Sequence, residues 1–592
     1  MLLQAPAFAP TRRFQHSRSS RVAQPCRAVH VVSAPALSDL PPCVLYEDEH
    51  LLVVHKPAGL NTHAPAPHAV DGIYDWLRCR EPRWASLAIH QRLDKETSGV
   101  LVFGLSPVAN KSLTEQLTAR TAVKSYTLLA QRPRGGSALF VAPPAGVTVS
   151  REPDGWLRVT SGVARRGERY VCSSEGDEAV TLFRELGGQT EGGAALVEAR
   201  PLTGRTHQIR VHAAALGAPL LGDALYGGAP SSRLWLHASS LTLTHPASGR
   251  RVCFEAPRDA MGSRAPYGIA RALVRSDETD IFRLQHGRGS AGDARAFIDC
   301  LGDTALVQSE EEQPKEPHTL LGSTPLGEDG TRISRVMHKR LRRDLRTQAG
   351  EDTSPTLLSG VPGADSFCVL ENRVRFGLRV TEGYSVGLFH DQRENRRRLL
   401  TGYVAPGFGP LLPPQHPGGA RAEVLNVFSY TCGFSLCAAM AGARATSLDL
   451  SRKYLTWGEE NFALNGVDPA QHDFIFGDAF DWLARLARKG RLFSVVLLDP
   501  PTFSTAKGAR FSAEQDYGQL VAAALRVLAP GGVLFCSTNA ARLSPVAFLV
   551  EVHAAVADAG RQVAAEHFAT QPPDFSGREE PAYLKTVWLR VQ

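Results

Sequence analysis

The stretch HQRLDKETSGVLVFG, residues 90–104, joins a highly charged segment to an apolar one. Its second half contains the run VLVF, residues 100–103, which has the composition of a short buried strand. Its first half carries Arg92 and Asp94 in a cluster of charges. Such a cluster is often only a solvated surface turn. The carboxylate at the mouth of a buried strand therefore needs a second element to define its role.

A second stretch supplies that element. AALVEARPLTGRTHQIRVHAAALG, residues 194–217, has the pattern of a strand, a glycine-containing turn and a helix, and it offers Arg205, His207 and Arg210. An arginine that faces a buried aspartate keeps the carboxylate ionised at neutral pH, as a nucleophile requires. Neither a second carboxylate at fixed spacing nor a His/Cys cluster accompanies Asp94. Paired-acid hydrolysis and metal catalysis are therefore disfavoured.

These stretches resemble the RluA-like family of RNA pseudouridine synthases. HQRLDKETSGVLVFG is similar to the family signature H-R-L-D-x-x-T-S-G, with Gln91 as an insertion. LTGRTHQIRVHAAALGAPLLGDALYGG resembles the second signature, and LWLHASSLTLTHPASG resembles the closing motif. AVKSYTLL supplies the expected tyrosine, Tyr126. The short strands punctuated by Gly and Pro independently favour a mixed α+β domain built around an antiparallel sheet.

The resemblance implies a role for each of four residues. Asp94 would be the nucleophile that assists cleavage of the uridine glycosidic bond, after which the base turns and rejoins through a ring carbon. Arg205 would pair with Asp94 and hold it ionised, and no cofactor would be needed. Tyr126 would lie against the uracil ring, unless it is only a core aromatic residue. Arg92 would fill the space that the extruded nucleotide leaves, unless it is a phosphate clamp.

The pattern changes near residue 422 to alternating apolar strands and helical stretches, which predicts a parallel sheet covered by helices. NVFSYTCG, residues 426–433, follows one such strand and precedes a helix, where a nucleotide-like cofactor meets a βα turn. Asp449, Asp478 and Asp499 each follow a later strand. Acids at the carboxyl ends of parallel strands line one crevice, although a single aspartate there is more often a helix N-cap.

This part of the chain resembles class I S-adenosylmethionine-dependent methyltransferases, and more narrowly the RlmI/RlmK-type rRNA methyltransferases. The segments that carry the likeness are NVFSYTCGFS, LDLSRKYLTWGEENFALNG, LLDPPTFSTAKG and GYSVGLFHDQRENRRRLL. TDIFRLQHGRGSAG resembles a small domain that precedes the catalytic sheet. Cys432 replaces a glycine that is usual in the cofactor loop. The resemblance implies S-adenosylmethionine as cofactor, with these ligands: Phe428, Ser429, Tyr430, Gly433, Asp449, Asp478, Asp499 and Pro500.

The sequence leaves the methylated atom open. Methylation of a pyrimidine at carbon 5 needs a cysteine nucleophile, whereas methylation of a purine ring nitrogen does not. DPPTF contains no cysteine, and Cys536 in LFCSTN is either that nucleophile or a buried strand thiol. Relatives that methylate a guanine ring nitrogen resemble DPPTFS at least as well. A purine target is therefore favoured over cytosine.

The 592 residues predict a multidomain protein. We expect an α+β mixed-sheet pseudouridine synthase domain over residues 39–265. A small RNA-binding-type α+β domain with the acidic loop SEEEQPKEPH follows over 275–385, and an α/β Rossmann-like methyltransferase domain over 386–592. The methyltransferase half is either a second enzyme or a non-catalytic RNA-binding module.

Two basic segments are candidate phosphate contacts, and each can equally be a solvated helix face. The first is Arg396-Arg397-Arg398. The second, Lys339 to Arg346, lies in RISRVMHKRLRRDLRT, residues 332–347, which predicts a basic amphipathic helix.

The net charge of +7 is concentrated at the N-terminus. Residues 1–38 contain arginines 12, 13, 18, 21 and 27 but no acidic residue and no lysine, and the rest of the chain carries about +2. An Arg- and Ser-rich leader without acids predicts a disordered transit peptide, for a chloroplast rather than a mitochondrion. The alternative is a basic arm that binds nucleic acid.

Two further observations limit the function classes. The sequence has no run of eighteen apolar residues, so no membrane span is expected. Its ten cysteines form no C-x-x-C pair, which argues against a zinc or iron–sulfur site and favours reduced thiols. The sequence thus predicts a bifunctional enzyme that isomerises uridine and methylates a base in RNA, with ribosomal RNA favoured as the partner and no metal.

Overall fold

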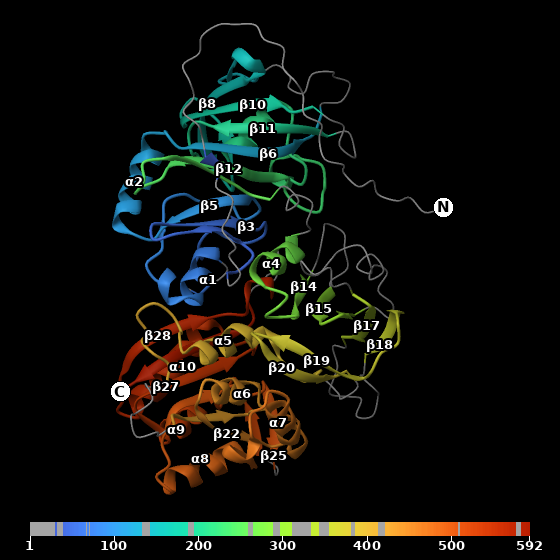
Figure 1. Ribbon diagram of the computed structural model, residues 1–592, viewed down its shortest axis with the longest axis vertical. Coiled ribbons are helices and arrows are strands. Elements are labelled where there is room, and N and C mark those ends of the chain that lie inside the picture. The colour runs from blue at the N-terminus through green and yellow to red at the C-terminus, as the bar shows by residue number, and fades with distance from the viewer. Residues whose placement is uncertain are drawn as a thin grey trace.

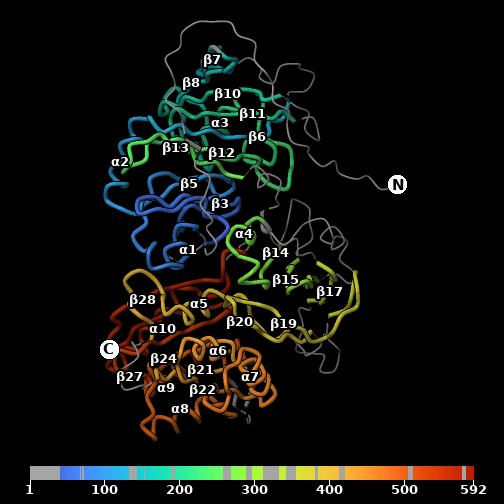
Figure 2. Tube along the Cα trace, viewed as in Figure 1, coloured from blue at the N-terminus to red at the C-terminus, as the bar shows by residue number. Residues whose placement is uncertain are grey.

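The structure is a computed structural model of the chain. In Figures 1 and 2 the first unit, coloured from blue to green, forms the upper part of the molecule, and the second and third units, coloured from green through yellow and orange to red, lie below it. Within the described parts of the chain, no helix is long and apolar enough to cross a membrane. The structure describes residues 30–31, 40–66, 68–69, 72–132, 143–187, 194–257, 265–287, 296–310, 333–341, 355–380, 385–412, 421–506, 509–575 and 582–592.

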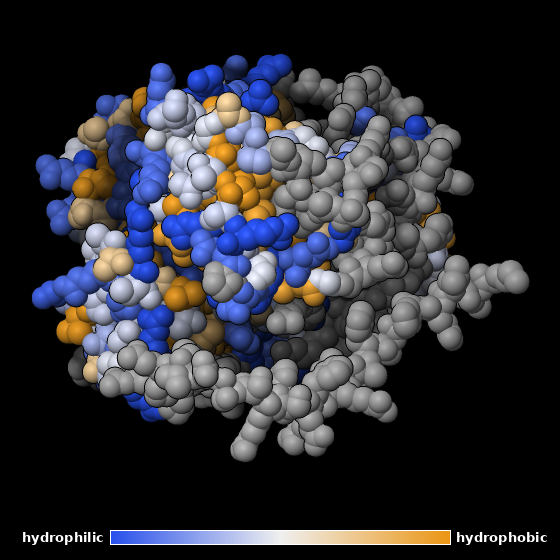
Figure 3. All heavy atoms as spheres, turned by 90° about the horizontal axis from the view of Figure 1, so that it is seen from above, coloured by the Kyte–Doolittle hydropathy of each residue, from blue (hydrophilic) through white to orange (hydrophobic). Residues whose placement is uncertain are grey.

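The first unit is built on one mixed sheet of 13 strands. The strands are β1 (His30–Val31), β2 (Val44–Glu47), β3 (Leu51–Lys56), β4 (Ala88–Ile89), β5 (Ser98–Gly104), β6 (Val123–Ala130), β7 (Thr148–Arg151), β8 (Leu157–Arg166), β9 (Arg169–Cys172), β10 (Asp177–Glu185), β11 (Ala195–Pro201), β12 (Leu236–Thr244) and β13 (Arg251–Glu255). Their main path is β2-β3-β5-β12-β6-β11-β10-β8-β7, and most neighbours are antiparallel. Helices α1 (Ile73–Arg80), α2 (Pro107–Thr118) and α3 (Gln208–Ala215) pack on it, so the expected α+β domain is confirmed. Seen from above in Figure 3, the described part of this unit shows hydrophobic patches bordered by hydrophilic side chains.

Strand β5 is the buried strand that the VLVF run predicts, and all seven of its residues are buried. It pairs antiparallel with β3 and parallel with β12. Gly99 has φ +126°, and a Cβ at this position would lie 2.2 Å from the carbonyl oxygen of Ala238 on β12. Only glycine permits this approach of the two backbones. The loop that carries Asp94 is therefore anchored directly at the centre of the sheet.

The second unit is a five-stranded sheet in the order β14-β15-β16-β17-β18, with helix α4 (Ala265–Leu273) packed against β14. Its strands are β14 (Ile281–Gly287), β15 (Ala296–Leu301), β16 (Thr304–Ser309), β17 (Arg335–Arg340) and β18 (Thr356–Gly360). The acidic loop falls outside the described residues from position 311 onward.

Strand β17 contradicts the amphipathic helix predicted over residues 332–347. Residues 335–339 are all buried, and the strand pairs with β16 and β18 on its two sides. Short apolar segments do not distinguish a strand from a helix by periodicity, and here the two neighbouring strands decide. Lys339 is a buried strand residue, and residues 342–346 lie outside the described part of the chain.

The third unit is a seven-stranded sheet in the order β23-β22-β21-β24-β27-β29-β28, in which β29 alone runs antiparallel to its neighbours. Its strands are β21 (Glu423–Val427), β22 (Arg444–Asp449), β23 (Asp473–Phe476), β24 (Phe493–Leu498), β27 (Leu528–Thr538), β28 (Val563–Ala569) and β29 (Lys585–Val591). The helices are α5 (Arg393–Thr401), α6 (Gly433–Met440), α7 (Arg452–Leu464), α8 (Ala479–Arg488), α9 (Tyr517–Leu525) and α10 (Pro545–Asp558). Two hairpins complete it: β19 (Ser366–Glu371) with β20 (Val374–Arg379), and β25 (Phe503–Ala506) with β26 (Ala509–Ser512). The α/β fold predicted for this half is confirmed.

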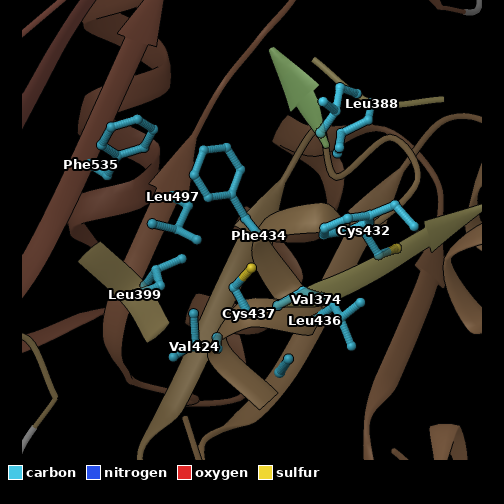
Figure 4. Close-up of a cluster of buried hydrophobic side chains, with 14 of the residues drawn as sticks. Val374, Leu388, Leu399, Val424, Cys432, Phe434, Leu436, Cys437, Leu497 and Phe535 are labelled. Atoms are coloured by element: carbon cyan, nitrogen blue, oxygen red, sulfur yellow. The ribbon is translucent and has the colours of Figure 1, made fainter. Parts of the chain in front are cut away.

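The second and third units share one hydrophobic core. Figure 4 shows Phe434 of α6 beside the sheet residues Leu497 and Phe535, with Leu399 of α5 near Leu497 and Val374 of β20 near Leu436, all in one cluster. The same cluster of buried residues extends to strands β14, β15 and β16 of the second unit. The boundary expected near residue 385 therefore does not divide the hydrophobic core.

Residues 396–398 are neither phosphate contacts nor a solvated helix face, which corrects both interpretations. Arg396 donates to both carboxylate oxygens of Glu371, at 2.6 and 2.7 Å, and the two side chains are 3% and 1% exposed. Arg397 donates to Glu81 of the first unit, and Arg398 is buried. These arginines lie inward because α5 is covered on several sides by other parts of the chain.

The end of α1 docks the first unit onto the other two. Arg397 donates to Glu81 at 2.8 Å and to the carbonyl oxygen of Arg80 at 2.8 Å. Tyr403 donates its hydroxyl to the carbonyl oxygen of Arg78 at 2.8 Å. The guanidinium of Arg80 lies 3.5 Å from Glu278, which precedes β14. Figures 1 and 2 accordingly show α1 beside α5.

The leader lies largely outside the described residues. Of positions 1–38 the structure describes His30 and Val31, which pair in parallel with Val252 and Cys253 of β13. This strand lies inside the segment that the sequence predicts to be a disordered transit peptide.

We expect Glu371→Gln to lower the free energy of unfolding by about 3–5 kcal/mol, because it leaves the buried Arg396 guanidinium without its counter-charge. Urea denaturation followed by circular dichroism measures the change. Glu460→Gln is the matched control, since it removes a 53% exposed carboxylate from its pair with Arg379 and is expected to cost about 0–1 kcal/mol. Equal losses in the two variants would contradict the prediction.

Candidate active sites

A cleft of roughly 690 Å³ opens in the first unit between the loop before β5 and the turn before α3. This volume is of the size that holds a small ligand such as a nucleotide. The two stretches that the sequence singles out thus meet at one site. The cleft is lined by Arg92, Asp94, Tyr126, Arg205, His207 and Arg210, among others.

Asp94 is the acidic group at the centre of this cleft. Its Oδ2 lies 3.5 Å from Nη1 of Arg210 and 3.7 Å from Nε2 of His207. Its side chain is 30% exposed, so the carboxylate is open to the cleft rather than enclosed. The amide of Thr97 donates to the carbonyl oxygen of Asp94 at 3.0 Å, which holds the loop in a tight turn before β5. The carboxylate is therefore both positioned and reachable.

Arg210 is the guanidinium that pairs with Asp94. The buried Asp223 accepts from its Nε at 2.7 Å and from its Nη2 at 2.8 Å, which leaves Nη1 directed at Asp94. Burial by itself lowers the pKa of Arg210, but the hydrogen bonds and charge of Asp223, together with Asp94, raise it above its ordinary value. A bidentate clamp of this kind fixes the plane of the guanidinium. Arg210 is thus a permanent cation held against Asp94.

Arg205 does not pair with Asp94, so that prediction is corrected. Its Nη1 lies 3.3 Å from Asp177, and its Nε donates to the carbonyl oxygen of Glu178 at 3.1 Å. Arg205 precedes α3 in the turn, where its side chain is directed toward β10. Arg210 lies within α3, which brings its guanidinium to Asp94.

Gln208 and His207 build the turn that sets this geometry. Gln208 accepts from the hydroxyl of Thr203 at 2.6 Å and from the amide of Arg205 at 3.0 Å. His207 has φ +55°, an uncommon value for a residue with a side chain, and its Nδ1 lies 2.8 Å from the hydroxyl of Tyr226. Burial lowers the pKa of His207 by more than nearby Asp94 raises it, so the ring is neutral at neutral pH.

Tyr126 and Arg92 line the cleft, and their roles stay predictions. Burial and the charge of Asp94 raise the pKa of Tyr126, which keeps its phenol protonated. Arg92 is exposed. The ring of His90 lies 3.0 Å from Asn110 of α2, and the inserted Gln91 separates it from Arg92. His90 is therefore directed toward α2.

Lys56 is a buried residue beside this cleft that the sequence patterns did not predict. Its ammonium donates to the carbonyl oxygens of Pro57, Leu60 and Lys95 at 2.9, 2.6 and 3.0 Å. Burial lowers its pKa from 10.5 to about 7. Lys56 joins the loop after β3 to the loop that carries Asp94. The sequence signal is a lysine in front of Pro-Ala-Gly at the end of a buried strand.

In the third unit, the loop between β21 and α6 has an unusual backbone. Phe428, Tyr430 and Cys432 have φ values of +62°, +49° and +61°. Left-handed backbone strains residues with a side chain, which explains why glycine is usual at position 432. Gly458 leaves room for the side chain of Cys432, because a Cβ at position 458 would lie 2.3 Å from the Cys432 sulfur.

Asp449 holds this strained loop at the end of β22. Its two carboxylate oxygens accept from the amides of Tyr430 and Ser451, each at 2.8 Å. Burial raises the pKa of Asp449, more than these hydrogen bonds lower it. Among the other expected ligands, Ser429 donates its amide to Leu448, Gly433 begins α6, Phe428 packs 5.8 Å from the ring of Phe511, and Pro500 is buried.

Asp478 is the N-cap of α8, which is the alternative role of an aspartate that follows a strand. Its Oδ1 accepts from the amide of Asp481 at 3.1 Å. This bond satisfies one of the free amides at the start of the helix. A contact with a cofactor is thus not required to explain Asp478.

Asp499 is a buried carboxylate at the end of β24. Nε2 of Gln392 donates to its Oδ1 at 3.2 Å and to the hydroxyl of Ser537 at 2.8 Å. Burial raises the pKa of Asp499 from 3.8 to about 6, against smaller opposing contributions from Ser537 and Gln392. The neighbouring strand β27 thus turns Ser537, not Cys536, toward Asp499.

Cys536 is a buried strand thiol. It is fully buried in a cluster with Leu498, Tyr517 and Phe548, on the side of β27 opposite Ser537. Burial raises its pKa far above the ordinary range of a thiol. Cys536 is therefore unsuited to be the nucleophile of carbon-5 methylation.

The residues present fit S-adenosylmethionine. The strand order reverses between β21 and β24, and ligands of such sheets bind outside the carboxyl ends at that point. The loop 428–432 follows β21 and Asp499 follows β24, so they flank the switch point. The Asp449 oxygens each accept one amide and retain a second lone pair for a ribose hydroxyl. Within the described parts of the chain, no group of three or more His, Cys, Asp or Glu residues is arranged to hold a metal ion.

Comparisons with known proteins find relatives of both halves of the chain. The RNA pseudouridylate synthase family matches residues 50–215, and the S-adenosylmethionine-dependent methyltransferase family matches residues 283–590. The ribosomal large subunit pseudouridine synthase C of Escherichia coli K12 is 34% identical over 242 residues, which are 39% of this chain and 70% of that protein. A ribosomal RNA large subunit methyltransferase of Deinococcus radiodurans is 36% identical over 262 residues, which are 44% of this chain and 59% of that protein.

The match thus covers less than two thirds of the Deinococcus relative. Among solved structures, the SAM-dependent methyltransferase from Agrobacterium tumefaciens aligns with 53% of this chain and 91% of its own, at 19% identity and a TM-score of 0.40.

Fold and sites together define an enzyme with two catalytic units. The chain belongs to the RNA pseudouridylate synthase family through its first unit and to the S-adenosylmethionine-dependent methyltransferase family through its second and third units. The methyltransferase units use S-adenosylmethionine.

We expect Arg210→Lys to slow pseudouridine formation by roughly 10- to 100-fold, the scale of losing a charge-assisted hydrogen bond of about 1.5–3 kcal/mol. A lysine cannot bind Asp223 bidentately and reach Asp94 at the same time. Arg205→Lys is the matched control and is expected to remain within about threefold of wild type. Pseudouridine is quantified by mass spectrometry in RNA from cells that lack the protein. A larger loss for Arg205→Lys would overturn the assignment of Arg210.

We expect methyl transfer to depend on ionised Asp499 and to fall about tenfold per pH unit below pH 6, where this carboxyl becomes protonated. Rates of methyl incorporation measured between pH 5 and 8 test this. Asp499→Asn should be slower and lack this acidic limb. The effect on stability has the opposite direction. Between pH 3.8 and about 6, Asp499 stays protonated in the folded state but is ionised in the unfolded chain, so its contribution to the free energy of unfolding declines as the pH rises. The prediction would be contradicted if Asp499→Asn were slower but the rate of the wild type did not fall below pH 6.

Proposed function

We propose that this enzyme acts on structured ribosomal RNA, where one unit isomerises a uridine and the other methylates a base. The observation that carries the proposal is the Asp94–Arg210 pair, which joins the two signature stretches inside a cleft of nucleotide size. The names of the relatives support ribosomal RNA as the substrate, because one is a ribosomal large subunit pseudouridine synthase and the other a ribosomal RNA large subunit methyltransferase.

In the first unit, the target uridine leaves the RNA stack and enters the cleft. Arg210 pairs with Asp94 and orients it, so that the carboxylate acts as the nucleophile while the glycosidic bond breaks. Tyr126 stays protonated beside it and lies against the base. Arg92, exposed in the lining of the cleft, takes the place of the uridine in the stack.

In the third unit, Asp449 and the loop 428–432 hold the cofactor, which supplies an electrophilic methyl group when it is bound. Asp499 and the hydrogen bonds of Gln392 and Ser537 orient the acceptor base at the switch point. We propose a nitrogen acceptor on a purine, because Cys536 is buried on the other side of the sheet. A nitrogen lone pair needs no covalent activation by a thiol.

We further propose that residues 1–38 are a transit peptide and that the enzyme works in an organelle. The chloroplast is favoured over the mitochondrion. The support is the acid-free, Arg- and Ser-rich composition of the leader. A fluorescent protein fused behind residues 1–38 should enter plastids, and diffuse fluorescence would reject the proposal.

The decisive experiment maps modified nucleotides in organellar and cytosolic RNA from cells that lack the protein. Rescue with wild type should restore one or more pseudouridines and a methyl mark. Rescue with Asp94→Asn should restore the methyl mark alone, and rescue with Asp499→Ala the pseudouridine alone. If no methyl mark depends on Asp499, the methyltransferase half binds RNA without catalysing methyl transfer. If the pseudouridine survives Asp94→Asn, the proposed role of Asp94 fails.

A further inference from the structure

A second cavity, of roughly 460 Å³, lies between the five-stranded sheet and the methyltransferase sheet. Strands β14 to β17 supply one wall with Arg283, Phe297 and Lys339. The other wall comes from the segment 385–391 and from Tyr583. Its volume is within the range of pockets that enclose a small ligand.

The cavity adjoins the site of methyl transfer. Phe389 in its wall packs against Tyr430 of the cofactor loop, with ring centroids 5.2 Å apart. Asp391 in the same wall precedes Gln392, whose amide donates to Asp499. The negative charge of Asp391 also contributes to the raised pKa of Asp499. A base in the cavity would therefore lie beside residues that contact Asp499 and the cofactor loop.

Several planar side chains are packed together in the walls of the cavity. The Arg283 guanidinium lies between the rings of Phe297 and Phe575, at 5.4 and 4.5 Å from their centroids, and pairs with the buried Asp299. The ring of His286 stacks on Tyr583 at 5.7 Å with an interplanar angle of 7°. Stacked planar groups favour a heterocyclic base over a flexible ligand.

A hydrogen-bonded pair of polar side chains, Tyr583 and Asp391, also lines this wall. The hydroxyl of Tyr583 donates to Oδ2 of Asp391 at 2.9 Å. Burial and the charge of Asp391 raise the pKa of Tyr583, so the phenol stays protonated and acts as the donor. The bond fixes the carboxylate plane and leaves Oδ1 and a second lone pair on Oδ2 as acceptors.

We propose that this cavity receives the methyl-acceptor base after it leaves the RNA stack, and that Asp391 selects guanine. A carboxylate accepts two hydrogen bonds side by side, and guanine presents two adjacent N–H donors, at N1 and N2. Adenine and cytosine place an unprotonated ring nitrogen next to their amino group, and uracil places its one N–H between two carbonyl oxygens. Each of them would leave the carboxylate facing an acceptor at a cost of several kcal/mol.

The test rests on the proposed function, because it uses the RNA site whose methyl mark depends on Asp499. Transcripts that carry guanosine or inosine at this one position are methylated by the full-length enzyme. Inosine lacks the N2 amino group, so the wild type should methylate it roughly 10- to 100-fold more slowly. Asp391→Asn should slow guanosine by a similar factor and abolish the preference over inosine. Tyr583→Phe should reduce the preference, whereas Tyr403→Phe, which loses a hydroxyl outside the cavity, should keep it.

Cofactor binding measured by calorimetry and pseudouridine formation by the same variants establish that the proteins are folded. If the methyl mark lies on a base other than guanine, or if Asp391→Asn keeps the full preference for guanosine, the inference is wrong and the proposed methyltransferase function stands. If the wild type methylates no RNA in an Asp499-dependent manner, the proposed function of this half fails, and the inference fails with it.

Discussion

The ion pairs of helix α5 join it to other parts of the third unit and to the first unit. Arg396 pairs with Glu371 of the β19–β20 hairpin, Arg393 with Asp574 near the C-terminus, and Arg397 with Glu81 at the end of α1. Buried charges are tolerated only where each finds its counter-charge, so the three contacts constrain one another. Loss of one contact would leave an arginine unpaired inside the molecule. One short helix thereby fixes the position of both catalytic units.

Each active site joins distant parts of the chain by a comparable constraint. Asp94 and Arg210 are 116 residues apart in sequence, and Asp223 holds the guanidinium of Arg210 in place beside Asp94. In the other unit, Gln392 at the start of α5 reaches Asp499 and Ser537, so the helix that unites the units also orients the catalytic edge of the sheet. Side chains that hold distant segments together therefore also orient the catalytic groups.

The second unit is packed directly against the methyltransferase sheet. It shares its hydrophobic core with the methyltransferase sheet and supplies one wall of the cavity that contains Asp391. The methyltransferase fold leaves the carboxyl edge of its sheet open to solvent at the switch point. A neighbouring sheet that closes this edge excludes water and adds flat walls, which a base-modifying enzyme needs.

The sequence by itself determined the order of the units, the buried strand β5 and the position of Asp94 beside it, and the aspartates at the ends of β22 and β24, because these follow from local patterns of apolar residues and turns. Only the tertiary structure decided that Arg210 rather than Arg205 meets Asp94, that residues 335–340 form a strand, and that residues 396–398 point inward. Each of these depends on a partner far away in the chain. Local periodicity carries no information about such partners, and the burial of a charge is decided by what lies opposite it.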